Sequence, residues 1–225
     1  MDINLLKQRW FSTWNHAGAV GNPSLIWRNI EKQYSEPHRH YHTLSHIHHC
    51  LNQLEVVWRD VSDPYLISWA LWFHDYFYSL KNTSNERHSA NMSMRTAQSA
   101  KLPTQFMFST GWLVFATKKH RIIPRKGVSE TDMAIMLDID LSILGKPWKQ
   151  YDEYRKNIRQ EYVKVPWGIY APKRAGILSN FLKRPQLFYF PFFFDQYEQQ
   201  ARTNLEREIE FLAYKGVGHE VSSIG

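Results

Sequence analysis

Apolar residues recur along this chain every three or four positions, which is the spacing of one face of a helix. The spacing is clearest between Thr43 and Trp58, where one stripe contains Leu44, Ile47, Leu51, Leu54 and Trp58. Alternation with a period of two, which would indicate strands, is nearly absent, and so are Asn-Gly and Asp-Gly turns. The pattern therefore predicts an all-α fold with a helix over about 43–58.

Two pairs of an asparagine or aspartate followed by proline mark further helix starts, because Asn or Asp caps a helix and proline fits its first position. The pairs are Asn22-Pro23 and Asp63-Pro64, and an earlier helix surrounds Leu5 and Trp10. Other helical segments are expected at 85–99, 103–119, 129–143, 146–162, 171–183 and 191–214. Gly216 is the expected stop of the last one.

The composition is that of an ordinary globular protein. The chain has 225 residues, of which 43% are hydrophobic and 15% aromatic, enough for one domain with a sizeable core. No apolar stretch approaches the length that spans a membrane, and the N-terminal residues lack the apolar segment of a secretory signal. The single cysteine, Cys50, excludes an internal disulfide. We therefore expect a cytoplasmic protein without a membrane partner.

Polar residues interrupt the apolar pattern at three places. His74-Asp75 lies within an apolar run from Trp69 to Tyr78, six histidines fall between residues 38 and 49, and Asp138 and Asp140 interrupt a third apolar stretch. A buried charge costs several kcal/mol unless it is paired or bound to a cation, and imidazoles and carboxylates are good ligands for divalent ions. By helical periodicity alone, however, His46 would lie on a solvated face opposite the leucine stripe.

These motifs resemble the HD superfamily of metal-dependent phosphohydrolases. Tyr41-His42-x-x-x-His46 is similar to the Tyr-His-Asn-x-x-His signature of the cyclic nucleotide phosphodiesterases, with Thr43 in place of the Asn, and Asp140-Leu141-Ser142 is similar to their Ala-Asp-Leu-Ser. The resemblance implies that His42 is a general acid. The ligands that it implies for one divalent ion are His46, His74, Asp75 and Asp140. Asp138 is the alternative last ligand, or else an N-cap or a partner of an imidazole.

Longer segments resemble the predicted metal-dependent HD phosphohydrolases of bacteria. They are residues 34–44, 72–75, 85–90, 137–145, 158–166 and 201–205. This resemblance suggests Glu86 as an acid or base and Arg159 as a phosphate clamp, the alternatives being a capping Glu and a salt-bridged helix Arg. A second ion would use His120 and His88, which are otherwise two exposed histidines. The implied organisation is one HD-type domain over 1–225, with a metal-binding core at about 36–145 and C-terminal helices at about 146–215.

The net charge of +7 favours an anionic partner. Lys118, Lys119 and Arg121 surround His120, and together with Arg39 they are expected to bind phosphate oxygens. No zinc finger or aromatic-basic repeat is present, so a nucleic-acid partner is not expected.

The predicted function is hydrolysis of a phosphate ester, of a nucleotide or another small phosphorylated metabolite. The alternatives are a catalytically silent nucleotide-sensing HD domain and a di-iron HD-type oxygenase. The metal is expected to be held by His and Asp without a thiolate. Ligands of this kind suit Mn²⁺, Mg²⁺, Fe²⁺ or Co²⁺ better than the ligands of a structural zinc site do. Ni²⁺ and Zn²⁺ are further candidates for the ion.

Overall fold

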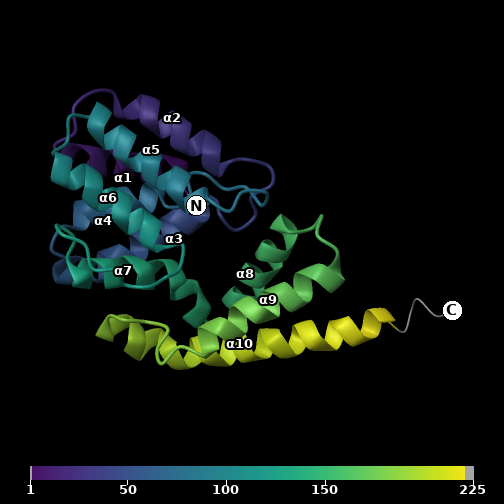
Figure 1. Ribbon diagram of the computed structural model, residues 1–225. Coiled ribbons are helices and arrows are strands. Elements are labelled where there is room, and N and C mark those ends of the chain that lie inside the picture. Colours follow the sequence, from purple (N-terminus) through teal and green to yellow (C-terminus); the bar gives the residue numbers. More distant parts are fainter. Residues whose placement is uncertain (1, 221–225) are drawn as a thin grey trace. The chain divides into compact units, whose positions relative to one another are not determined.

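The computed structural model describes residues 2–220, and the side chains of residues 2–214. Within this range the chain consists of helices joined by short loops, and one isolated bridge, Arg125 to Val128, is its only β-type pairing (Figure 1). The predicted all-α fold class is confirmed. The chain forms two compact units, Met1–Asp140 and Leu141–Gly225. The boundary between these units lies close to residue 145, the predicted end of the metal-binding core. The assignment of the whole chain to one domain stays a prediction.

The first unit contains most of the helices. They are α1 (Ile3–His16), α2 (Pro23–Tyr34), α3 (Leu44–Val56), the 3₁₀ helix η1 (Trp58–Asp60), α4 (Pro64–Phe73), α5 (Asn85–Ser99), α6 (Thr104–Ala116) and α7 (Glu130–Leu141). The predicted caps are present: the Asn22 side chain accepts hydrogen bonds from the first amides of α2, and the Asp63 side chain from those of α4. These local signals place the helix starts as the sequence predicts.

Helix α4 is the central element of this unit. Every residue from Leu66 to Phe73 is buried, and α1, α3, α5 and α6 pack around the helix. An aromatic cluster fills the space between α4 and α1, where the ring centroids of Trp10 and Trp69 are 5.3 Å apart. A helix that is apolar on all sides belongs in the interior. The residues that follow its last turn are therefore carried into the core.

The second unit consists of the 3₁₀ helix η2 (Ser142–Gly145), α8 (Trp148–Glu161), α9 (Trp167–Leu182) and α10 (Pro191–Glu220). Helix α10 packs along α9 and η2. A Cβ atom on Gly145 would lie 2.3 Å from the Cβ of Tyr197, so this contact requires glycine. The Asn204 side chain donates hydrogen bonds to the carbonyl oxygens of Leu144 and Lys146 and so ties η2 to α10.

Two predicted helix ends differ from the structure. Helix α9 begins at Trp167 rather than at residue 171, and Pro172 lies inside it. Helix α10 continues past Gly216 to Glu220, so the predicted stop is wrong. Glycine inside a helix costs only about 1 kcal/mol relative to alanine, which weakens a helix without ending it.

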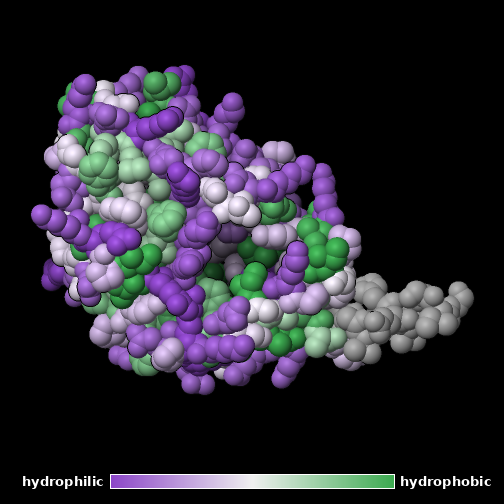
Figure 2. Space-filling view, viewed as in Figure 1, coloured by the Kyte–Doolittle hydropathy of each residue, from purple (hydrophilic) through white to green (hydrophobic). Residues whose placement is uncertain are grey.

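Hydrophilic residues cover most of the face seen in Figure 2, and hydrophobic residues form small patches between them. Among the helices of the described residues, none combines the length and the apolar character that crossing a membrane requires.

Candidate metal centre

The pair His74-Asp75 lies at the carboxyl end of α4. The helix ends at Phe73, and His74 is its C-cap, with φ −60° and ψ −36°. Its ring is buried, as are the residues Leu66 to Phe73 that precede it. At this helix end the two adjacent side chains lie close together, and His74 Nε2 is 3.1 Å from Asp75 Oδ2.

Arg39 holds this corner from the loop before α3. Its guanidinium donates hydrogen bonds to the carbonyl oxygens of Asp75 at 2.7 Å and Tyr76 at 2.9 Å, and its Nε donates to the Glu36 carboxylate at 3.0 Å. The carbonyls that end a helix lack intrahelical partners, and Arg39 supplies donors for the chain just after α4. The predicted phosphate-binding residue is thus placed inside the protein, where its side chain is 0% exposed.

His46 reaches the same place from the first turn of α3. The Thr43 side chain caps this helix by accepting a hydrogen bond from the Ser45 amide. The His46 ring is buried, and its Nε2 lies 3.1 Å from His74 Nε2. The solvated face that periodicity alone predicts for His46 is wrong, because α3 meets the end of α4 on this side.

Asp140 approaches from the last turn of α7. Its Oδ1 lies 3.2 Å from His46 Nε2 and 3.5 Å from His74 Nε2, and its Oδ2 lies 2.9 Å from His120 Nε2. Asp138 lies inside the same helix, which excludes the N-cap role. Two residues along a helix amount to about 200° of rotation, so the two carboxylates point in different directions. It is Asp140 that the structure brings to the paired imidazoles.

The separations of these donor atoms fit ligands around one ion. Ligand atoms about 2.1 Å from a cation lie about 3.0 Å apart at a right angle and about 3.4 Å apart at the tetrahedral angle. The distances among His46 Nε2, His74 Nε2 and Asp140 Oδ1 are 3.1, 3.2 and 3.5 Å. Asp75 Oδ2 lies 3.1 Å from His74 Nε2 and 3.8 Å from His46 Nε2. His46, His74 and Asp140 therefore offer three mutually close donor atoms that could hold a metal ion, and Asp75 lies beside His74 at their edge.

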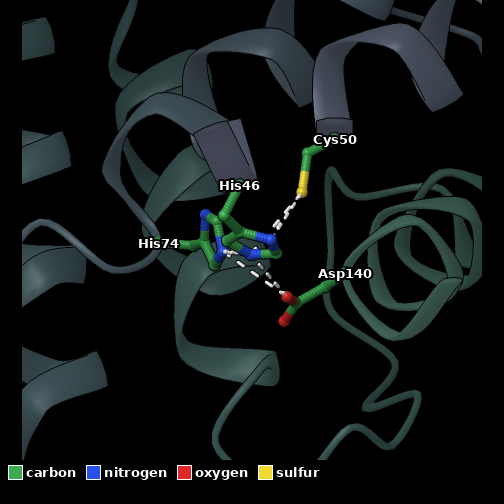
Figure 3. Close-up of side chains that lie close together, drawn as sticks. All are labelled: His46, Cys50, His74 and Asp140. Carbon is green, nitrogen blue, oxygen red and sulfur yellow. Dashed lines mark hydrogen bonds and ion pairs between the residues drawn. The ribbon is translucent and has the colours of Figure 1, made fainter. Parts of the chain in front are cut away.

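Cys50 is a further donor at the cluster, where the sequence predicts no thiolate. Its Sγ lies 3.6 Å from His46 Nε2, and the donor atoms of His46, Cys50, His74 and Asp140 all lie within 4.8 Å of one another. Figure 3 shows these four side chains pointing toward one another. The available signal was its spacing: residues four apart on a helix share a face.

The orientation of the His74 ring suits a metal ligand. Its Nδ1 lies 2.8 Å from the carbonyl oxygen of Leu71, and hydrogen bonding there directs Nε2 into the cluster. Metal-binding histidines commonly hold their second ring nitrogen in this way, which fixes the tautomer and the ring plane.

Burial and mutual attraction shift the titration of the cluster. Burial alone would lower the pKa of His74, but the carboxylates of Asp75 and Asp140 hold it well above its ordinary value. Burial lowers the pKa of His46, and the hydrogen bond with Asp140 only partly offsets this. Burial would raise the pKa of both carboxyl groups, but the charge on His74 holds each below its usual range. His74 and the two carboxyl groups therefore shift one another's pKa in opposite directions.

The pKa of the Cys50 thiol shifts in the opposite direction to the pKa values of the two carboxyl groups. Burial, together with the negative charges of Asp140 and Asp75, raises the pKa of Cys50 well above its ordinary value. Without a cation, Cys50 therefore remains a neutral thiol beside the cluster.

His42 borders the cluster. Its Nε2 lies 4.0 Å from Asp75 Oδ2, and its ring stacks on Tyr78 with centroids 4.2 Å apart. The side chain of His42 is 19% exposed, against 1% for His46. A group in this position can be reached from solvent, whereas the ring of His46 cannot.

The basic segment after α6 reaches the cluster through His120. This residue has a φ of +44°, a conformation unusual for a residue other than glycine, and its ring contacts Asp140. Lys118 donates a hydrogen bond to the carbonyl oxygen of Thr83 at 2.8 Å. The exposed neighbours of His120 in this segment are Lys118, Lys119 and Arg121.

Two further predicted residues, His88 and Arg159, have hydrogen bonds of their own, and a third, Glu86, lies at the start of a helix. Among the described side chains of the first unit, no hydrogen bond or ion pair joins His88 or Glu86 to the cluster. His88 lies on α5 with its Nδ1 3.0 Å from Asn82 Nδ2, and Glu86 lies in the first turn of the same helix. Arg159 lies on α8 in the second unit, where it donates hydrogen bonds to the carbonyl oxygens of Tyr162 and Val165.

No protein-family model matches this chain, and neither does any curated protein sequence or any solved structure. The residues of the chain itself are therefore the basis for any functional assignment.

Proposed function

We propose that this protein is a metal-dependent phosphohydrolase of the HD type, which cleaves a phosphate ester of a nucleotide or another small phosphorylated metabolite. One observation carries the proposal: donor atoms of His46, His74 and Asp140 lie 3.1–3.5 Å from one another, and the carboxylate of Asp75 lies 3.1 Å from His74. The resemblance of their motifs to the HD superfamily supports the same reading. Two carboxylates would also balance the charge of one divalent ion.

These four side chains would hold the ion, and their supports would fix its surroundings. A divalent ion in such a site supplies a Lewis acid for phosphoryl oxygens and activates water as a nucleophile. Arg39 keeps the backbone of Asp75 in place, and the carbonyl of Leu71 orients His74. These contacts reduce the rearrangement that binding requires.

His42 is the residue that we propose as the proton donor to the leaving oxygen. Its ring lies beside Asp75, is partly exposed, and is oriented by stacking on Tyr78. Imidazole is the side chain most often used for general acid catalysis, and this position would let it meet a substrate at the edge of the cluster. Lys118, Lys119 and Arg121 would hold the remaining phosphate charge.

The contacts favour hydrolysis with one ion over the di-iron oxygenase. A second ion would need additional imidazoles, and of the two candidates only His120 reaches the cluster, through Asp140 Oδ2. His88 is engaged with Asn82.

The test is a substrate screen with controlled metal content. Metal-stripped protein is reloaded separately with Zn²⁺, Co²⁺, Mn²⁺ and Mg²⁺ and assayed against phosphomonoesters, nucleotides and cyclic nucleotides. We expect hydrolysis of at least one class that requires added metal, is lost in His46→Ala and survives in the control His88→Ala. Metal-loaded protein that binds nucleotides but hydrolyses none of these substrates would contradict the proposal and favour the nucleotide-sensing alternative.

A further inference from the structure

Cys50 occupies a position from which it can act on the ion directly. It lies one helical turn after His46 on α3, and it is completely buried. Its Sγ is 3.6 Å from Nε2 and 3.7 Å from Nδ1 of the His46 ring. Its sulfur and the donor atoms of His74 and Asp140 lie within 4.8 Å of one another. A buried cysteine ordinarily packs as a small apolar side chain, but this one faces imidazoles and a carboxylate.

The distance from sulfur to nitrogen fits shared coordination. With bonds of about 2.3 Å to sulfur and about 2.05 Å to nitrogen at the tetrahedral angle, the two ligand atoms are about 3.6 Å apart. Cys50 Sγ and His46 Nε2 have this separation in the structure. The near-equal distance to Nδ1 places the sulfur beside the ring, so the Cys50 side chain must rotate to bring its sulfur to an ion bound at Nε2.

We propose that Cys50 is a thiolate ligand of the same ion and that it makes the centre selective for Zn²⁺ or Co²⁺ over Mg²⁺ and Mn²⁺. This inference rests on the proposed function and specifies its metal. Coordination would release the thiol proton to solvent and form a sulfur–metal bond without any change of oxidation state. Thiolate favours softer ions, whereas a set of imidazoles and carboxylates alone also suits Mn²⁺ and Mg²⁺.

The experiment uses the absorption of Co²⁺ as its probe. Metal-stripped full-length protein is titrated with Co²⁺, and the same titration is made with Cys50→Ser and Cys50→Ala, each checked for folding by circular dichroism. We expect the native protein to develop an intense near-ultraviolet band from thiolate-to-Co²⁺ charge transfer. Both variants should bind Co²⁺ without this band.

Competition between ions gives a second readout. We expect Cys50→Ser to weaken Zn²⁺ binding by at least the tenfold typical of a lost outer-sphere contact, and Mn²⁺ binding much less. Co²⁺ that binds the native protein without the charge-transfer band would overturn the thiolate assignment and leave the proposed hydrolase intact. A native protein that binds no Co²⁺ at all would overturn both proposals.

Discussion

At the scale of single residues, the carboxylate of Asp140 contacts three imidazoles. Its two oxygens face His46, His74 and His120. We expect Asp140→Asn to lose the metal and the hydrolysis, because the amide keeps the shape but not the negative charge. Asp138→Asn should retain the metal at a cost of about 1–3 kcal/mol for a changed buried polar group. Elemental analysis of both purified variants is the measurement, and metal loss only in Asp138→Asn would move the ligand to that residue.

His42 and His46 should have separable roles, because one borders the cluster and the other is enclosed in it. We expect His46→Ala to lose metal and activity together. His42→Ala should keep the metal and slow turnover by about 10²- to 10⁴-fold, the usual loss with a general acid. Metal content and kcat are compared for both variants. An empty site in His42→Ala would mean that His42 is itself a ligand.

The sequence carried more information on some residues of this centre than on others. His46, His74, Asp75 and Asp140 belong to motifs that could be compared with a known superfamily. Cys50 belongs to no motif, and its closeness to Asp140 depends on the tertiary arrangement that brings these two helices together at His46. Arg39 has a charged side chain, which favours a surface role. Only the tertiary structure shows that its guanidinium donates hydrogen bonds to backbone carbonyl oxygens.

At the scale of elements, the corner between α4 and the following loop depends on Arg39. We expect Arg39→Met to destabilise the protein by about 3 kcal/mol, because three backbone carbonyls lose a charged donor. Metal affinity should fall with it, since Asp75 loses its anchor. Denaturant unfolding and metal titration measure the two effects.

The matched control for this clamp is Arg87→Met, an exposed arginine on α5. We expect it to change the free energy of unfolding by no more than about 0.5 kcal/mol. Equal effects of the two substitutions would contradict the clamp.

Helix starts were predictable where a cap and a proline mark them, whereas the end of α10 was not. Asn22-Pro23 and Asp63-Pro64 mark α2 and α4 because cap and proline act within one turn. Gly216 does not end α10, because a single glycine weakens a helix without supplying an alternative for its hydrogen bonds. The burial of His46 on a face that looks polar in sequence depends on a neighbouring helix, which periodicity does not report.

At the scale of the whole molecule, the second unit has its own buried polar centre. Arg174 Nε lies 2.9 Å from Glu208 Oε1, and the Tyr151 hydroxyl donates a hydrogen bond to the same carboxylate. We expect Glu208→Gln to destabilise the protein by about 3 kcal/mol, because Arg174 is left buried without its counter-charge. Metal content should not change, since the ligands belong to the first unit.

Thermal unfolding measures the loss of stability, and elemental analysis measures the metal content. The control is Glu206→Gln, at an exposed position on the same helix. Loss of metal from well-folded Glu208→Gln would show that the two units are coupled at the metal centre.

The most direct test of the central claim is a calorimetric titration of metal-stripped protein with Zn²⁺ and Co²⁺. We predict binding of about one ion per chain, as four converging donors of one site require. Binding should be abolished in His46→Ala and Asp140→Asn and preserved in His88→Ala. No binding by the native protein, or undiminished binding by both ligand variants, would contradict the claim that this cluster is a metal centre.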